Sequence, residues 1–449
     1  MKITAVLLAA GQGTRMKSGL PKMLHPICGQ PMVFHALAAA RSVSSGMPVV
    51  IIGHGADLVR QAIQDRAVCV VQEQQLGTGH AVLQAEELLK GKTDFVLVTY
   101  GDMPLLKPET LQRLVSVQLE NLGPLSVLTV FHDNPHGFGR IVRNPDGTVK
   151  AIVEEAQATA EQLAIRELNV GAYCFKADWL WKNLHLLKQS PKGEYYLTDT
   201  IELAAQTGQP VQAIVMDDFG ETIGVNNRVH LAEAEMTMRK RINERHMLAG
   251  VTMIDPATTF IDDQVKIGTD TVIWPNTYLF GNTSIGENCQ IGPGSHLRDT
   301  VIGNDCQVLM SVTEGAVVED HVEMGPFARL RKGAHLSSGV HMGNFGEVKD
   351  STLGPDVKMG HFSYIGNATI GAGTNIGAGT ITCNYDGEKK HPTVIGKDVF
   401  IGSDTMLVAP VTLGDGARTG AGSVVTKDVA PDTLVVGVPA RVIRKLTRK

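Results

Sequence analysis

The chain has 449 residues, and its 41 Lys and Arg against 46 Asp and Glu give a formal net charge of −5. This length exceeds one ordinary core, so we expect at least two domains. Charges of mixed sign offer no surface for nucleic acid, and six cysteines without CxxC spacing argue against a zinc cluster or a disulfide framework. Scattered thiols are typical of a reducing compartment, so we predict a cytoplasmic location.

An apolar run at residues 3–10 follows Lys2, as in a short secretory signal. The run stops at a glycine turn followed by Arg15 and Lys17, which favours a buried first strand entering a phosphate-binding loop. No later stretch is long enough to span a membrane. We therefore predict neither secretion nor membrane insertion.

Strand-like and helical patterns alternate up to about residue 225. Short apolar runs indicate strands at 3–8, 49–52, 68–71, 95–99, 126–131 and 171–175. This alternation predicts a mostly parallel, doubly wound α/β sheet in a first domain at 1–227. Residues 228–248 are rich in charge and lack Gly and Pro, so they predict a linker helix within 228–249.

An aliphatic residue recurs every six positions after Gly250. The repeat begins at Ile267, Ile273, Leu279, Ile285, Ile291 and Leu297 and resumes, with small shifts, as far as Leu413. One inward aliphatic side chain per short face is what a narrow solenoid core requires, so residues 250–449 are predicted to form a left-handed parallel β-helix. Three repeats per coil would stack Arg331 on Lys349.

A polar segment, residues 384–391, interrupts this repeat before Ile395 restores it. A polar excursion on a rigid solenoid is a position at which binding groups can be displayed. We therefore expect residues 384–391 to contribute to a ligand site.

A glycine turn, Gly11-Gln12-Gly13, follows the first predicted strand, with Arg15 and Lys22 just beyond it. Glycines let backbone N–H groups approach phosphate oxygens, and two cations can neutralise charge that develops on a pyrophosphate leaving group. Met16 replaces the third glycine of GxGxxG, and no GxxxxGK[ST] motif is present. A dinucleotide-binding dehydrogenase and a P-loop kinase are therefore disfavoured.

These residues resemble the sugar-nucleotide pyrophosphorylase family, whose signature is a glycine turn with Arg, then Pro-Lys. Gln72 with Leu76-Gly77-Thr78-Gly79, and Tyr100-Gly101-Asp102, match further family segments. The resemblance implies uridylyl transfer from UTP to a sugar 1-phosphate, with Arg15 and Lys22 catalytic. It implies nucleotide and sugar contacts at Leu8, Ala9, Ala10, Gly11, Lys22, Gln72, Gly77, Thr78, Tyr100, Gly101, Asp102, Gly139, Glu154, Asn169 and Asn226. Val170 departs from the small polar residue expected after Asn169.

Asp102 is predicted at the end of an apolar strand, where a Mg²⁺ ion bound to phosphates requires a carboxylate. Water and substrate oxygens would complete the shell. A helix N-cap is the alternative role for Asp102. The resemblance adds Asn226 as the second metal contact.

A pyrophosphorylase-like half joined to a long hexapeptide repeat resembles the bifunctional uridyltransferase/acetyltransferase family of UDP-N-acetylglucosamine synthesis. Its acetyltransferase markers match residues 325–331, 343–345, 360–364 and 375–380. The resemblance implies that glucosamine 1-phosphate is acetylated with acetyl-CoA and that the product is then uridylylated. It also implies a homotrimer formed through the β-helices, with acetyl sites between subunits.

His361 is the predicted base for acetyl transfer, because imidazole is partly unprotonated near neutral pH and can accept a proton from the attacking amine. By resemblance, glucosamine 1-phosphate contacts Arg331, Lys349, Tyr364, Asn375 and Lys390, the last of these from a neighbouring subunit. Acetyl-CoA contacts, by the same resemblance, are Ala378, Asn384, Tyr385, Ser403 and Ala421.

Two positions depart from the family pattern. Gly437 replaces an arginine before the final Val-Pro, so a cation for the CoA phosphates would have to come from elsewhere, with Arg441 and Arg444 as candidates. Gly346 stands where a branched apolar residue is expected. The basic segment 441–449 is interpreted either as this cation source or as a solvated end without a role.

Two other functions stay open. In a single-activity pyrophosphorylase the β-helix would serve only oligomerisation or regulation, but His361 with its flanking motifs argues against this. A non-catalytic solenoid that binds sugar nucleotides would not need Arg15, Lys22 and Asp102. Each alternative predicts the loss of a specific activity in the purified protein.

Overall fold

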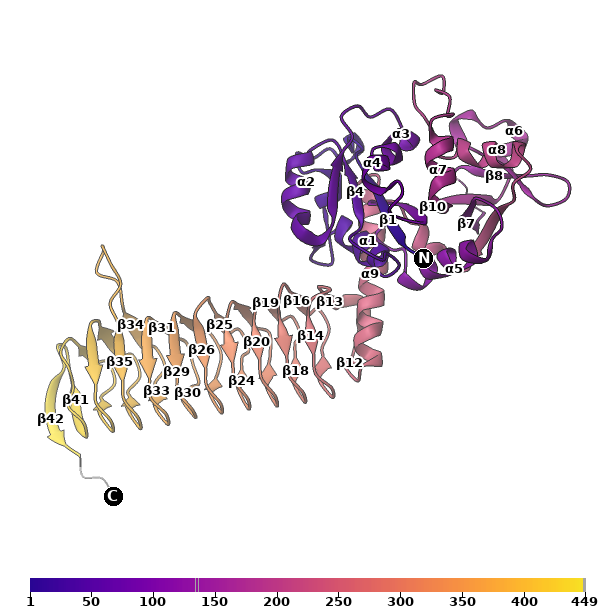
Figure 1. Cartoon of the computed structure of the whole chain (residues 1–449). Helices are drawn as coiled ribbons and strands as arrows, with labels where there is room; N and C mark the ends of the chain where they lie inside the picture. The colour runs from indigo at the N-terminus through magenta and orange to yellow at the C-terminus, as the bar shows by residue number, and fades with distance from the viewer. Residues whose placement is uncertain (134, 136, 447–449) are drawn as a thin grey trace. The chain divides into compact units, whose positions relative to one another are not determined.

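The computed structural model describes residues 1–133, 135 and 137–446. The chain folds into two compact units, Met1–Met238 and Arg239–Lys449, which Figure 1 colours from indigo to yellow. The division falls inside helix α9 (Arg228–Leu248). The linker helix expected here is present, and its residues are divided between the two units. The domain limits expected from the sequence stay a prediction.

A mixed sheet forms the centre of the first unit. Its strands are β1 (Ile3–Ala9), β4 (Val49–Ile52), β5 (Val68–Val71), β6 (Phe95–Tyr100), β7 (Leu125–Phe131), β8 (Arg140–Arg143), β9 (Val149–Val153), β10 (Glu167–Lys176) and β11 (Val211–Met216). The order is β11-β7-β10-β6-β1-β4-β5, with the β8–β9 hairpin beside β10. All six strands expected from the sequence are present. Strands β6, β1, β4 and β5 are parallel as expected, whereas β10 runs antiparallel to β6 and β7.

The first unit also contains the helices α1 (Met32–Arg41), α2 (Ala56–Ile63), α3 (Thr78–Leu83), α4 (Glu86–Leu89), α5 (Pro108–Glu120), α6 (Ala160–Leu163), α7 (Ala177–Leu184) and α8 (Asp199–Gln206), and a short hairpin of β2 (Pro26–Ile27) and β3 (Gln30–Pro31). Helices cover both faces of the sheet. Leu7 and Ala9 of β1 pack with α1 and α5, whereas Val6 and Leu8 pack with α3, α7 and α8. Successive side chains of a strand point to opposite faces, so an uninterrupted apolar strand must be covered twice.

The second unit is a parallel β-helix with three faces. The first face contains β12 (Thr252–Met253), β15 (Val272–Ile273), β18 (Gln290–Ile291), β21 (Gln307–Val308), β24 (Glu323–Met324), β27 (His341–Met342), β30 (Lys358–Met359), β33 (Asn375–Ile376), β36 (Phe400–Ile401), β39 (Arg418–Thr419), β41 (Thr433–Val436) and β42 (Arg441–Lys445). The second face contains β13 (Phe260–Ile261), β16 (Tyr278–Phe280), β19 (His296–Arg298), β22 (Val312–Glu314), β25 (Arg329–Leu330), β28 (Gly346–Lys349), β31 (Ser363–Gly366), β34 (Ile381–Cys383), β37 (Met406–Val408) and β40 (Val424–Val425). The third face contains β14 (Lys266–Ile267), β17 (Ser284–Ile285), β20 (Val301–Ile302), β23 (Val317–Val318), β26 (Ala334–Leu336), β29 (Ser351–Leu353), β32 (Ala368–Ile370), β35 (Thr393–Ile395) and β38 (Val411–Leu413).

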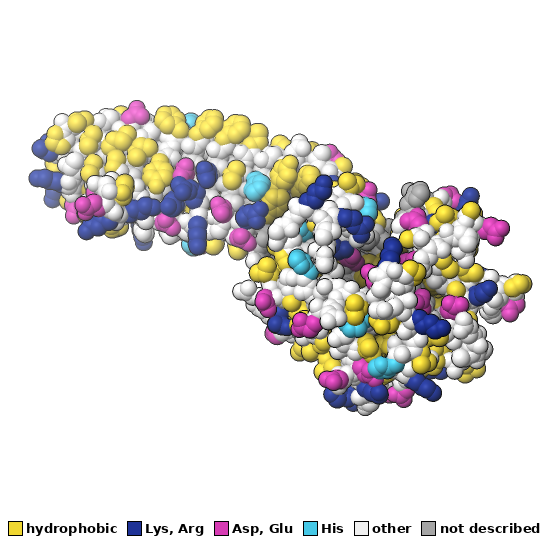
Figure 2. All heavy atoms as spheres, turned by 90° about the horizontal axis from the view of Figure 1, so that it is seen from above, with side chains coloured by type: hydrophobic (Ala, Val, Ile, Leu, Met, Phe, Trp, Pro, Cys, Tyr) yellow, Lys and Arg dark blue, Asp and Glu magenta, His cyan; other side chains and the backbone are white. Residues whose placement is uncertain are grey.

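The six-residue repeat explains these coils. Repeat residues such as Ile285, Leu336 and Ile401 are buried inside the coil, and the residue before each of them points outward. Figure 2 shows that exposed hydrophobic side chains form rows along the β-helix on the face seen there, with Lys and Arg side chains gathered beside them. Apolar and basic side chains are therefore grouped separately on this face of the β-helix.

The C-terminal segment adds a strand to the first face. Strand β42 pairs antiparallel with β41, and its five residues are exposed. The first five residues of the basic segment expected at 441–449 are thus part of the β-helix, whereas residues 447–449 lie outside the described residues.

Among the described residues, no helix has the length and apolar character needed to cross a membrane. The same residues contain no group of three or more His, Cys, Asp or Glu side chains placed to hold a metal ion. No disulfide joins the cysteines of the described residues.

Candidate active sites

A cavity of about 470 Å³ lies beside the residues that follow β1 and β6 in the first unit. Its lining includes seven residues expected from the sequence: Arg15, Tyr100, Asp102, Gly139, Glu154, Asn169 and Asn226. These residues are distant in the chain and meet because β10 pairs with β6, next to β1. The structure brings them to one cavity, and their individual roles stay predictions.

Two cationic side chains and two side chains with acceptor oxygens meet at the edge of this cavity. The Lys22 ammonium forms an ion pair with the Asp102 carboxylate and donates to Asn226 Oδ1 at 3.1 Å. The Arg15 guanidinium donates to the same Asn226 oxygen at 3.0 Å. Asp102 and Asn226 thus hold a positive charge between them, and their oxygens are the ligand types that a hard divalent cation prefers.

Polar groups from β10 and from the segment after β9 form another wall of the cavity. The Asn169 side chain donates to Tyr173 Oη at 2.8 Å and accepts from the Gly171 backbone N–H at 3.1 Å. Thr198 Oγ1 donates to Glu154 Oε1 at 3.2 Å. Burial raises the pKa of the Glu154 carboxyl above its ordinary value. An amide and a carboxyl held in this way suit the hydroxyl groups of a sugar.

The other residues expected to bind the nucleotide lie outside the described lining of this cavity. The Gly101 backbone N–H donates to Leu8 O at 2.9 Å, which joins the ends of β6 and β1. Gln72 is buried and donates to Gly77 O at 3.2 Å, while Thr78 Oγ1 accepts from the Leu197 N–H at 2.9 Å. These contacts order the segment between β5 and α3, and its part in nucleotide binding stays a prediction.

Some residues of the cavity were not expected from the sequence. They include Phe219, Thr222, Ile223, His230 and Glu233. His230 and Glu233 lie three positions apart on α9 and therefore on one helix face, just after Asn226. Their spacing on one helix face could have indicated that both belong to the site. Phe219 and Thr222 belong to a short turn whose sequence carries no such pattern.

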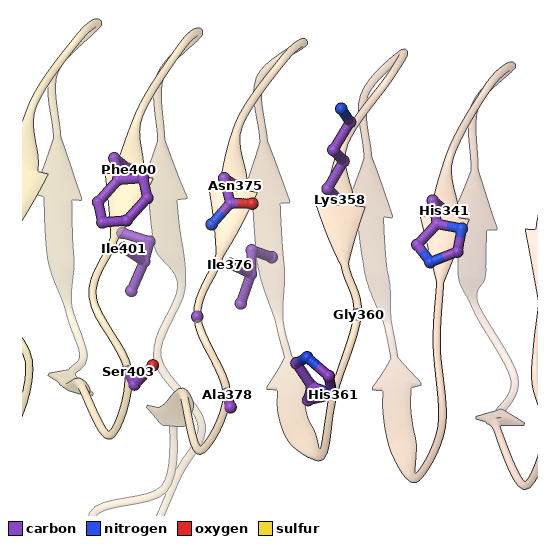
Figure 3. A pocket seen from close by; sticks show the side chains of 11 residues that line it. His341, Lys358, Gly360, His361, Asn375, Ile376, Ala378, Phe400, Ile401 and Ser403 are labelled. Atoms are coloured by element: carbon purple, nitrogen blue, oxygen red, sulfur yellow. The ribbon is translucent and has the colours of Figure 1, made fainter.

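A hollow of about 400 Å³ lies on the first face of the β-helix (Figure 3). It is lined by His341, Lys358, Gly360, His361, Asn375, Ile376, Gly377, Ala378, Phe400, Ile401 and Ser403. Figure 3 shows His361 beside Ala378 at the corner that follows β30. No described residue forms a hydrogen bond or ion pair with the His361 ring, which is exposed, so its nitrogens are open to a ligand.

Three cations lie together beside the second face: Arg331 directly follows β25, Lys349 ends β28, and Lys390 belongs to the excursion at residues 384–391. Arg331 and Lys349 follow the register of β25 with β28, which stacks them as the repeat predicts. Arg331 donates to Glu347 Oε1 at 3.0 Å. The nearby Lys390 ammonium lowers the pKa of Lys349, and Arg331 adds a smaller effect in the same direction. Like charges held close together favour an anion such as phosphate.

The polar excursion at residues 384–391 projects between β34 and β35, as Figure 1 shows. Tyr385 and Lys390 form an antiparallel bridge within it. This bridge belongs to the same chain as Lys349, so the expected contact of Lys390 with a neighbouring subunit stays a prediction. Asn384 donates to Asn367 Oδ1 at 2.7 Å. Asn384, Tyr385 and Ala421 lie outside the described lining of the hollow, and their binding of acetyl-CoA also stays a prediction.

The two departures from the family pattern have structural explanations. A Cβ built on Gly346 would lie 2.5 Å from Met359 Cε and 2.9 Å from Met342 Cε, so methionine side chains fill the space of the missing apolar residue. Gly437 has φ +100°, a left-handed conformation in which an arginine would be strained.

Comparison with known proteins agrees with this architecture. Residues 5–164 match the MobA-like NTP transferase domain, and residues 264–299 and 392–427 match the bacterial transferase hexapeptide (six repeats). The fold and the two sites thus define a transferase that joins an α/β nucleotidyltransferase domain to a left-handed β-helix of hexapeptide repeats.

Relatives match the chain from end to end. The bifunctional protein GlmU of Geobacillus sp. strain WCH70 is 46% identical over 97% of this chain and 95% of its own length. The GlmU protein of Exiguobacterium sibiricum is 47% identical over 96% of both chains, and that of Streptococcus equi subsp. zooepidemicus is 44% identical over 99% of this chain and 97% of its own. The chain therefore belongs to the GlmU family of bifunctional proteins.

Proposed function

We propose that this enzyme makes UDP-N-acetylglucosamine in two steps. The β-helix acetylates glucosamine 1-phosphate with acetyl-CoA, and the first unit then transfers uridylyl from UTP to N-acetylglucosamine 1-phosphate with release of pyrophosphate. The observation that carries this proposal is the pair of separate sites. Lys22, Asp102 and Asn226 meet at a strand end in one unit, and the open imidazole of His361 lies in a hollow of the other.

Uridylyl transfer follows from the charges at the first cavity. A phosphate oxygen of the sugar phosphate attacks the α-phosphorus of UTP, and the bond to pyrophosphate breaks in line with the attack. Lys22 and Arg15, which both contact Asn226, would neutralise the charge that develops on the leaving pyrophosphate. Glu154 and Asn169, which line the cavity, would hold the sugar hydroxyls. The step needs no covalent intermediate with the protein.

Asp102 and Asn226 would hold the divalent metal, and we propose Mg²⁺. One carboxylate and one amide oxygen leave most coordination positions for water and phosphate oxygens, as Mg²⁺ prefers. The Lys22 ammonium already lies against both oxygens, which supports a cation at this place. When bound, the ion would neutralise phosphate charge during the transfer.

Acetyl transfer follows from the exposed His361. Its ring nitrogen accepts a proton as the sugar amine attacks the thioester carbonyl carbon, after which the carbon–sulfur bond breaks and CoA leaves as a thiol or thiolate. The three cations beside the second face, Arg331, Lys349 and Lys390, would hold the sugar phosphate. The amine could then reach His361 from the second face across the corner at Phe362.

A homotrimer formed through the β-helices is part of the proposal. One corner of the coil carries a ladder of large apolar side chains, Met310, Phe327, Phe345 and Phe362, which we name the aromatic corner. These side chains are 39%, 53%, 59% and 56% exposed, and the rings of Phe327 and Phe345 stack at 5.3 Å. Exposed aromatic ladders of this kind favour burial against another copy of the chain.

We also propose that the enzyme works in the cytoplasm. The six cysteines are scattered along the sequence without CxxC spacing, which is typical of a reducing compartment. Cys289 and Cys306 lie next to each other in the core, where the Cys306 N–H donates to Cys289 Sγ at 3.4 Å. A reducing compartment would keep both as thiols.

Assays with the purified full-length protein test the two activities separately. Glucosamine 1-phosphate and acetyl-CoA are supplied to measure CoA release, and N-acetylglucosamine 1-phosphate, UTP and Mg²⁺ to measure pyrophosphate release. We expect His361→Ala to lose CoA release about 10²-fold or more and to keep pyrophosphate release. Asp102→Asn should lose pyrophosphate release by about 10²-fold or more and keep CoA release. His321→Ala, an exposed histidine elsewhere on the β-helix, is the control that should keep both.

The outcomes separate the alternatives. If His361→Ala acetylates at the wild-type rate, the assignment of the base is wrong. If the wild type releases pyrophosphate but no CoA, the protein is a single-activity pyrophosphorylase with a structural β-helix. If it does neither and still binds a sugar nucleotide, it is a binding scaffold.

A further inference from the structure

A straight row of outward side chains crosses the first face of the β-helix at the hollow. Lys358 pairs with Asn375, Asn375 with Phe400, Phe400 with Arg418, and Arg418 with Leu434. Directly paired residues in a sheet project to the same side. The row therefore runs without interruption from β30 to β41, and its part from Lys358 to Phe400 forms one side of the hollow (Figure 3).

A second row, of small side chains, runs parallel to the first along the corner. Figure 3 shows Ala378 and Ser403 on successive coils beyond His361. Ala421 follows on the coil after Ser403, because β36 and β39 pair Phe400 with Arg418, and Ser403 and Ala421 are both exposed. Phe327 and Phe345 belong to the neighbouring row of Phe362, not to this one. An extended ligand that starts at His361 thus meets only small side chains along the corner in the direction of Ala421.

Arg418 is the cation that such a ligand meets. It lies three strands from Lys358, a distance of about 14 Å at roughly 4.8 Å per strand. Its side chain is exposed, and no described residue forms a hydrogen bond or ion pair with its guanidinium. Phe400, which lines the hollow and is 48% exposed, lies between Asn375 and Arg418 in the row and offers an apolar surface to the ligand.

The two arginines expected from the sequence lie farther away. Arg444 pairs with Leu434 on β42, one strand beyond β41, and Arg441 pairs with Val436 at the end of the same hairpin. Arg418 is thus nearer to His361 by two strands of the face. It was not expected from the sequence, because its place beside Phe400 follows only from the register.

We infer that Arg418 binds the phosphate groups of acetyl-CoA in this chain, with Phe400 packing against the arm that links them to the thioester. This inference rests on the acetyl transfer proposed above and names a residue that determines affinity for the co-substrate. Arg418 supplies the positive charge that Gly437, with no side chain and a left-handed backbone, does not. A guanidinium group can bind phosphate through two parallel hydrogen bonds, a bidentate geometry that a lysine ammonium does not reproduce.

The test compares two acetyl donors, acetyl-CoA and S-acetylpantetheine, which has the thioester and the arm but no phosphate. For Arg418→Ala we expect the KM for acetyl-CoA to rise about tenfold or more, with kcat within about twofold, while the KM for S-acetylpantetheine stays at the wild-type value. Arg418→Lys should give an intermediate KM. Calorimetric titration with coenzyme A should show the same loss of affinity without any reaction. Lys397→Ala, an exposed lysine on a neighbouring turn, should leave all values unchanged.

Each contrary result has a distinct meaning. If the wild type acetylates and Arg418→Ala keeps its KM for acetyl-CoA, the inference is wrong and the proposed function stands. If Arg418→Ala raises the KM of both donors equally, the residue acts on the fold and the inference is also wrong. If the wild type neither transfers acetyl nor binds coenzyme A, the proposed function fails and the inference fails with it.

Discussion

Gly171 shapes the wall of the first cavity through the ring of Tyr100. It has φ +88°, and a Cβ built on it would lie 2.7 Å from Cε2 of Tyr100. Tyr100 lines the cavity, and burial raises the pKa of its hydroxyl above the ordinary value. The ring is thus held neutral and close to the backbone of β10, where only glycine leaves room for it.

Gly171→Ala should therefore disturb the site as well as the fold. We expect it to lower the free energy of unfolding by about 1–3 kcal/mol and to slow pyrophosphate release about tenfold, because the Tyr100 ring must move into the cavity. CoA release should not change. Thermal unfolding and the two rate assays measure these effects.

Gly147→Ala is the matched control. Gly147 also has a left-handed backbone, φ +84°, but nothing lies within 4 Å of its built Cβ. This variant should show only the cost of backbone strain, about 1 kcal/mol, with normal pyrophosphate release. Equal effects of the two substitutions on both measurements would show that the Tyr100 ring is not displaced.

At the scale of elements, the distance between successive coils decides at which positions of the β-helix only glycine fits. Gly346 begins β28, and its built Cβ lies closest to the methyl ends of the flexible Met342 and Met359 side chains. Gly343 follows β27 directly. Its built Cβ would overlap the carbonyl oxygen of Gly360 on the next coil. A methionine can change rotamer, whereas a backbone carbonyl of the ladder cannot move alone.

Alanine substitutions at these two glycines should consequently differ. Gly346→Ala should change the free energy of unfolding by less than about 1 kcal/mol, and Gly343→Ala should cost about 3 kcal/mol or more. Thermal or denaturant unfolding of the β-helix measures both. A large loss for Gly346→Ala would mean that Met342 and Met359 are fixed, so that the glycine is a requirement of the coil and not a tolerated departure.

At the scale of the whole molecule, the aromatic corner connects assembly with acetyl transfer. Phe362 follows His361 directly, and Phe327 and Phe345 continue the ladder from it. A second copy packed on this corner would lie beside the hollow that holds the base. The first cavity is enclosed by residues of a single unit, so its activity should not depend on assembly.

The double variant Phe327→Asp, Phe345→Asp tests this dependence. Charges placed in a subunit contact are costly, so we expect the molar mass in solution to fall from that of a trimer to that of a monomer. CoA release should fall about tenfold or more, and pyrophosphate release should stay normal. Light scattering and the two assays provide the measurements.

Leu122→Asp is the control for this variant. Leu122 is an exposed apolar residue of the first unit, and its substitution should change neither mass nor activity. A wild-type protein that is monomeric at assay concentration and still acetylates would contradict the proposed trimer.

Much of the fold could be predicted because it depends on the spacing of apolar residues along short segments of the sequence. The apolar run of β1 requires a sheet covered on both faces, and the six-residue repeat requires a coil whose inward positions are Ile285, Leu336 and their equivalents. The antiparallel direction of β10 could not be predicted, since strand direction depends on partners and not on the strand's own residues.

The sequence by itself determined the family and the succession of an α/β sheet and a β-helix, and it named candidate residues for each site, because motifs such as Gly11-Gln12-Gly13 and the 360–364 segment combine local conformation with chemistry. Only the tertiary structure decided which of these residues touch. It placed the Lys22 ammonium against Asp102 and Asn226, and it aligned Arg418 with Phe400. The physical reason is that a contact between distant residues depends on strand register and loop length, and these are set by packing of the whole unit.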